Sequence, residues 1–115
     1  MEGKENRFLN FLIDCITAGN DIIKSFFKLE IVNKDNVPDM IINVSDDRNE
    51  LQILMLQLNF VMEGEEGINK FIKEVIKDEE AAKSFKAVLY KTIYTLFEAC
   101  KEKLQLTKTE TEGEN

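Results

Sequence analysis

Apolar residues recur at intervals of three and four over residues 4–29, which is the spacing of one face of an α-helix. The positions on this face are Phe8, Leu12, Cys15, Gly19, Ile22, Phe26 and Leu29. The Gly19-Asn20 pair interrupts the pattern, because glycine costs about 1 kcal/mol of helix propensity relative to alanine. We therefore expect one long amphipathic helix, or two shorter helices divided at Gly19 with Asn20 or Asp21 capping the second.

Residues 33–39 carry the clearest turn-forming side chains, among them Asp35, Asn36 and Pro38. The segments on either side of this turn are rich in β-branched residues, which favour an extended backbone. Residues 30–44 are therefore expected to form either a short hairpin or an irregular connection that crosses a helical bundle.

Residues 51–62 fit two patterns at once. Positions spaced as on one helical face are apolar, and so is every second position from Leu54 to Met62, as in a strand. Leu, Met and Gln outnumber the β-branched residues here, which favours a helix capped within residues 45–47. Such a helix is apolar on most sides, which suits a central element or one shared with a second subunit.

Glycines separate this segment from a short amphipathic helix over residues 68–77, and a last helix is expected to begin at Asp78. The apolar face of the last helix runs from Ala82 to Leu104, at helical spacing. Residues 107–115 lack apolar side chains and are predicted to form a disordered acidic tail.

These elements predict an all-α fold, a compact bundle of four or five helices in a single helical domain over residues 1–106. The alternative is an α+β fold in which residues 51–62 form a strand.

The chain contains no histidine, so it lacks a common metal ligand and the base of Ser/His or Cys/His nucleophile pairs. Acidic residues cluster at the expected helix starts and inter-helix loops, where helix capping explains them. Cys15 and Cys100 lie among apolar residues and are expected to be core side chains. We therefore predict that the protein is not an enzyme and uses no metal or other cofactor.

The formal net charge of −7 argues against direct nucleic-acid binding, because phosphate contacts need clustered Lys and Arg. An acidic surface instead suits a basic partner. The N-terminal residues are charged, and the longest apolar stretch is too short and too often interrupted to span a bilayer. The expected location is cytoplasmic, with no membrane contact.

Eight phenylalanines provide more aromatic surface than a small bundle must bury alone, which favours self-association or a partner groove. The candidate interface residues are Leu54, Leu58, Phe60, Met62, Tyr90, Tyr94 and Phe97. The expected function is that of a small acidic interaction module: an adaptor, inhibitor or regulator, of the kind that phages, viruses and plasmids encode. We expect it to act as a homodimer that binds a partner protein. The alternative is a helical bundle that binds a small apolar ligand or lipid.

Overall fold

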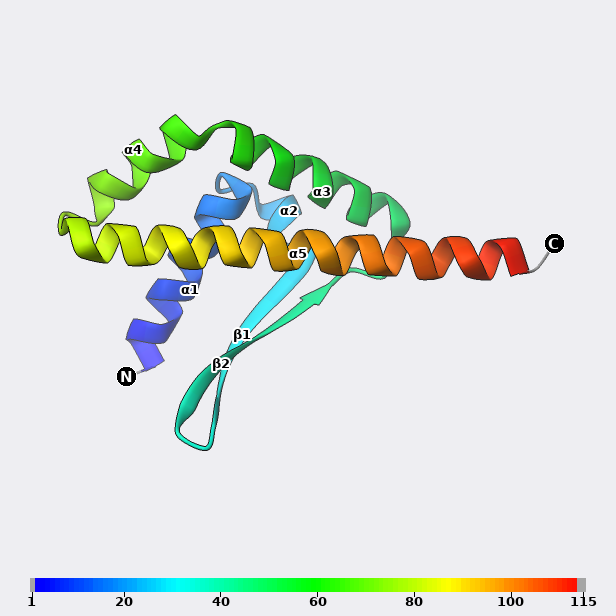
Figure 1. The fold of residues 1–115 in the computed structure, drawn as a ribbon, viewed down its shortest axis with the longest axis horizontal. Helices are drawn as coiled ribbons and strands as arrows, with labels where there is room; N and C mark the ends of the chain where they lie inside the picture. The colour runs from blue at the N-terminus through cyan, green and yellow to red at the C-terminus, as the bar shows by residue number, and fades with distance from the viewer. Residues whose placement is uncertain (1, 114–115) are drawn as a thin grey trace.

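The protein combines helices with a β-hairpin, so the all-α fold predicted from the sequence is wrong. The computed structural model describes the backbone of residues 2–113 and the side chains of residues 7–105. Its elements are α1 (Glu2–Thr17), α2 (Asp21–Lys24), β1 (Phe27–Lys34), β2 (Val37–Val44), α3 (Arg48–Glu63), α4 (Glu65–Val75) and α5 (Glu79–Gly113) (Figure 1). The fold is mixed α+β, but its strands are β1 and β2, and residues 51–62 are helical.

The first helical segment divides at Gly19, and the alternative of one continuous helix is incorrect. Ala18 and Gly19 both have positive φ, 54° and 76°, and the Gly19 amide donates to the Asp14 carbonyl oxygen at 3.2 Å. This left-handed pair ends α1 because it turns the next amides away from the helix axis. Asn20 then caps α2, since its Oδ1 accepts from the Ile22 amide at 2.9 Å.

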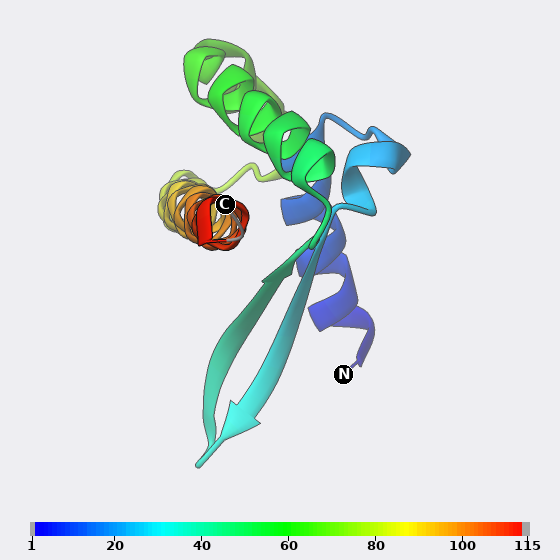
Figure 2. The same cartoon turned by 90° about the vertical axis from the view of Figure 1, so that its right-hand side faces the viewer.

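The hairpin is longer than the expected segment 30–44, because β1 already begins at Phe27. The strands pair antiparallel from Phe27 opposite Val44 to Lys34 opposite Val37. Asp35 and Asn36 form the two-residue turn with φ of 54° and 66°, the positive values that match the twist of paired strands. The base of the hairpin packs into the core, and its tip extends away from the helices (Figure 2).

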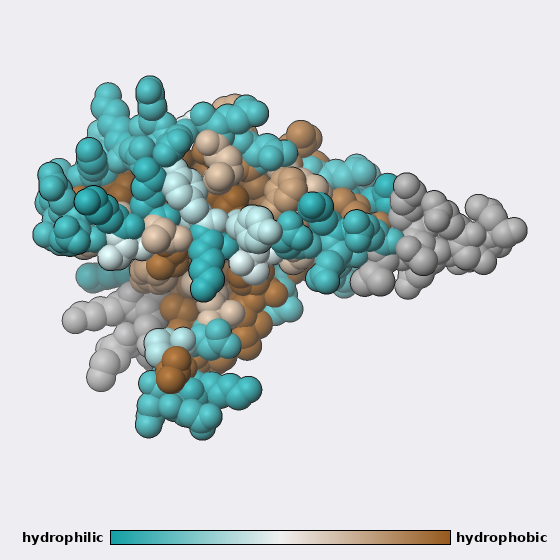
Figure 3. All heavy atoms as spheres, viewed as in Figure 1, coloured by the Kyte–Doolittle hydropathy of each residue, from teal (hydrophilic) through white to brown (hydrophobic). Residues whose placement is uncertain are grey.

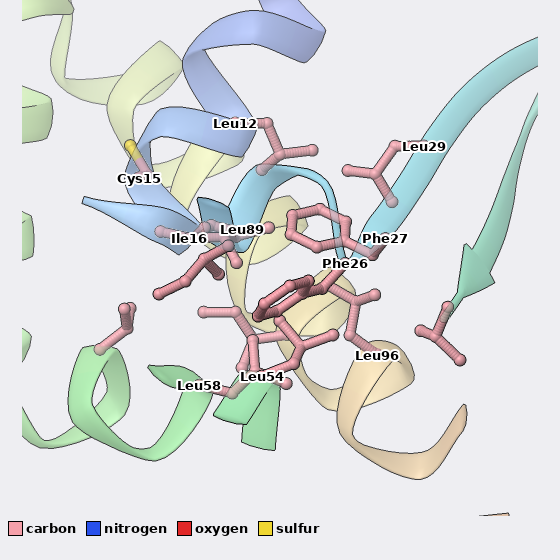
Figure 4. Packing of buried hydrophobic residues seen from close by; sticks show 14 of the residues in the cluster. Leu12, Cys15, Ile16, Phe26, Phe27, Leu29, Leu54, Leu58, Leu89 and Leu96 are labelled. Carbon is pink, nitrogen blue, oxygen red and sulfur yellow. The ribbon is translucent and has the colours of Figure 1, made fainter. Parts of the chain in front are cut away.

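The core lies where α1, α3 and α5 meet the base of the hairpin (Figure 2). Figure 4 shows side chains from these elements converging on one cluster. The fully buried side chains are Leu12, Ile16, Thr17, Leu51, Leu54, Leu58, Leu89, Leu96 and Cys100. Cys15 is also buried, so both cysteines are core side chains, as predicted. Burial raises the pKa of Cys15 to about 12 and that of Cys100 to about 11.

Helix α5 contacts the end of the hairpin through Lys103. Lys103 donates from its Nζ to the Val44 carbonyl oxygen at 2.9 Å and pairs with the Asp46 carboxylate. The backbone of α5 continues to Gly113, through most of the expected disordered tail at residues 107–115. Side chains beyond Gln105, and residues 114–115, lie outside the described part of the chain, so the prediction about order in the tail stays a prediction. Within the described residues no helix has the length and hydrophobicity needed to cross a membrane.

Candidate interaction surfaces

The structure distributes the seven candidate interface residues over three places. Leu54 and Leu58 have no exposed surface and belong to the core of the chain itself (Figure 4). They hold α3 against the rest of the fold and cannot meet a partner while that fold is intact. The remaining five residues lie on two different sides of α3.

Four of these five residues, together with the buried Leu58, line a shallow hollow between α3 and α5, with a volume of about 290 Å³. These are Met62, Tyr90, Tyr94 and Phe97. Tyr94 and Met62 are 68% and 47% exposed, so the rim of the hollow is accessible. Lysines lie over two of the other rings, with the Lys86 Nζ 5.5 Å from the centre of Tyr90 and the Lys101 Nζ 5.8 Å from that of Phe97.

The hydroxyl of Tyr90 is buried and makes no hydrogen bond. Burial of this hydroxyl, followed by the nearby Glu65 carboxylate, raises the pKa of Tyr90, while the Lys86 ammonium opposes the rise. Glu65 is close enough to act electrostatically on Tyr90, but its carboxylate pairs with the Lys86 Nζ at 3.3 Å. Tyr90 therefore anchors the hollow by packing, and only its partly exposed ring is open to a partner.

Phe60 faces the opposite side of α3 from Met62, because two residues along a helix correspond to about 160° around its axis. It lies in line with Ile53 and Leu56, at spacings of three and four. We call these three residues the outer stripe. Their exposed fractions are 45% for Ile53, 69% for Leu56 and 71% for Phe60. Figure 3 shows hydrophobic atoms breaking the hydrophilic surface along the upper edge, where α3 runs.

The outer stripe is the site feature that sequence reasoning missed, since only Phe60 was among the candidates. On a helix of 100° per residue its centre lies about 150° from that of the buried face, which comprises Leu51, Leu54, Leu58 and Val61. Thus α3 has one apolar face in the core and a second apolar line towards solvent. The available signal was that residues 51–62 are apolar on most sides of the helix.

A third surface is a groove at the corner where α3 turns into α4, with a volume of about 780 Å³. We call it the corner groove. Its lining comes from the end of α1, from α2 and from the α3–α4 junction: Asp14, Cys15, Ala18, Gly19, Lys24, Phe60, Val61, Gly64, Gly67, Ile68 and Phe71. Lys24 donates from its Nζ to Asp14 Oδ1 at 2.7 Å, and this hydrogen bond raises the pKa of Lys24.

Several of the clustered acidic residues cap helices or pair with lysines. The Asp47 side chain accepts from the Glu50 amide at 3.0 Å, and that of Asp78 accepts from the Ala81 amide at 2.9 Å. Asp46 pairs with Lys103 across the fold. Over the part of the chain that the structure describes, no three His, Cys, Asp or Glu side chains gather as a metal site would require. That the protein is not an enzyme and uses no cofactor stays a prediction.

No protein-family model matches this sequence, and neither a curated protein nor a solved structure matches the chain.

Proposed function

We propose that the protein is a non-enzymatic interaction module that binds a partner protein through the outer stripe. The observation that carries this proposal is the exposure of Leu56 and Phe60, each about 70% accessible, on the side of α3 that faces away from the core. Large apolar side chains gathered in a line on one helix are the pattern of a protein-binding face. A scattered exposed leucine would carry no such meaning.

The charge of the chain supports a basic partner. With a formal net charge of −7, the surface attracts positively charged proteins and repels nucleic acid. Adaptor, inhibitor and regulator are the roles that fit such a module, and the cytoplasm is the location that we propose for it.

Two copies of the chain can also pair through the outer stripe in the way that two-fold symmetric dimers do. Three side chains per copy bury much less than the roughly 800 Å² per partner of a standard stable interface. The homodimer that we propose is therefore weak and forms as the protein concentration rises.

The test compares three forms of the protein: wild type, the double variant Leu56→Gln with Phe60→Gln, and Val37→Gln as control. Val37 is 63% exposed but lies at the far end of the hairpin, so the control replaces an exposed apolar side chain away from the outer stripe. Sedimentation equilibrium over a range of concentrations measures self-association. Affinity capture from the native host finds partners, and calorimetry with each purified partner measures its direct binding.

We expect the double variant to stay monomeric and to lose the partner, with the control behaving as wild type. The proposal fails if wild type is monomeric at all concentrations and no purified partner distinguishes the double variant from the control. Unchanged circular dichroism of both variants shows that the fold is retained.

A further inference from the structure

The corner groove owes its width to missing side chains. Gly19 and Gly67 both line it, and a Cβ atom added at either position would meet no atom within 4 Å. Gly67 lies in the first turn of α4, where an alanine would be a better helix former. Helix propensity therefore does not explain a glycine at this position in α4. The absence of a side chain here does, however, leave space in the groove.

The walls of the groove are apolar and partly exposed. Phe60 from α3 and Phe71 from α4 are 71% and 42% exposed, and Val61 and Ile68 lie between them along the chain. Cys15 contributes a neutral thiol, because burial raises its pKa to about 12. A volume of about 780 Å³ falls within the roughly 300–1,000 Å³ of small-molecule sites.

Two carboxylates and one ammonium lie at or beside the mouth of the groove. Asp14 and Lys24 line the groove, with the Lys24 Nζ 2.7 Å from Asp14 Oδ1. Asp21 lies outside the lining and brings a second carboxylate to the same ammonium, 3.6 Å from the Lys24 Nζ. The Asp21 side chain is 94% exposed and that of Asp14 is 45% exposed, so both remain accessible to a second cation. The acidic protein around them adds to the attraction for positive charge.

We propose that the corner groove binds a small cationic amphiphile, with its apolar chain between Phe60 and Phe71 and its protonated amine at Asp14 and Asp21. This site goes beyond the protein-binding function proposed above and shares only Phe60 with the outer stripe. A small ligand fits because the groove has the size of a ligand site, and a cationic one fits because two carboxylates face one ammonium.

Three probes with the same ten-carbon chain test the site: decylammonium, decanol and decanoate, each used below the concentration at which it aggregates. Binding is measured by calorimetry and by NMR shifts of the groove residues. We expect decylammonium to bind about tenfold more tightly than decanol, and decanoate to bind most weakly. In Asp21→Asn the preference for the amine over the alcohol should fall severalfold.

Gly67→Leu fills the groove, and Gly67→Ala is the matched control that adds one methyl group to the same helix position. We expect Gly67→Leu to weaken all three probes at least tenfold and Gly67→Ala to leave them within about twofold of wild type. Both residues favour helix, so loss of binding cannot come from an unfolded α4.

Three outcomes would overturn the proposal. The first is absence of saturable binding by any probe, and the second is tighter binding of decanoate than of decylammonium. The third is that Gly67→Leu leaves probe binding unchanged but abolishes self-association or partner capture, which would make the groove a protein-docking site. Self-association and partner binding of the outer stripe variants are measured in separate experiments. Failure of the ligand-binding proposal would therefore not contradict the proposed protein-binding function.

Discussion

The same substitution at two glycines should change stability in opposite directions. Gly67 lies in the first turn of α4, whereas Gly19 has φ of 76° in the turn after α1. A Cβ atom at either position meets nothing within 4 Å, so packing makes no difference between them. The pair therefore isolates the effect of backbone conformation on the free energy of unfolding.

The magnitudes follow from the two conformations. Alanine in a helix is more stable than glycine by about 0.5–1 kcal/mol, and we expect Gly67→Ala to stabilise the protein by that amount. A left-handed backbone costs an L-residue roughly 1–2 kcal/mol, partly offset by about 0.4–1 kcal/mol because alanine restricts the unfolded chain. Gly19→Ala should therefore destabilise the protein by about 0.5–1 kcal/mol.

Urea denaturation followed by circular dichroism measures both changes. With an m-value of about 1.5 kcal/mol/M, the two midpoints should move apart by roughly 1 M in total. Equal m-values in the three proteins are the control for an unchanged unfolded state. The reasoning is refuted if both variants shift in the same direction, because steric contact is excluded at both positions.

Two further predictions concern the core. The pKa values of Cys15 and Cys100 are raised by burial from about 9 to about 12 and about 11, so folding favours the protonated thiols. Stability is then fully present below about pH 8 and falls as the pH rises from about 9 through the folded-state pKa values of about 11 and 12, by about 2–3 kcal/mol at pH 10 for the two thiols together. The double variant Cys15→Ala with Cys100→Ala should show a shallower decline in urea titrations between pH 8 and 10, and equal slopes would contradict this. Separately, Leu54→Ala should cost about 2–5 kcal/mol and Leu56→Ala less than about 0.5 kcal/mol, measured by the same denaturation; similar losses would mean that both leucines are buried.

The hairpin shows why the fold class could not be reached from periodicity. Phe26 and Leu29 continue the three- and four-residue spacing of the first helix, so the pattern extends a helical face into what is β1. In the structure Leu29 pairs with Ile42 across the two strands instead. Over a few residues, isolated apolar positions fit either a helix or a strand. The spacing of apolar residues within one strand does not show which strand it pairs with. The turn chemistry at Asp35 and Asn36 was the reliable signal.

For residues 51–62 the type of element could be predicted from the sequence, but its exposed side could not. Their richness in Leu, Met and Gln correctly favoured a helix, because these residues lose little side-chain freedom in one. The choice of interface residues on that helix did not follow, since Leu54, Leu58 and Phe60 are equally apolar in the sequence. Which side of α3 is buried depends on where α1 and α5 pack, and those contacts are long-range. The spacing does define one apolar face, which includes the buried residues Leu51, Leu54, Leu58 and Val61, but the second apolar line on the opposite side obscures which of the two is exposed.

The size of the outer stripe limits what it can do alone. Full burial of a leucine or phenylalanine side chain is worth about 1.5–3 kcal/mol, so covering the exposed parts of Leu56 and Phe60 yields roughly 2–4 kcal/mol. Association costs an estimated 4–15 kcal/mol in lost freedom of motion, which exceeds this gain. A tight partner must therefore extend beyond the stripe, and Phe60 offers continuity with the corner groove. We expect Leu56→Gln with Phe60→Gln to weaken a purified partner by about 30- to 1,000-fold in calorimetry, and a change below threefold would place the binding face elsewhere.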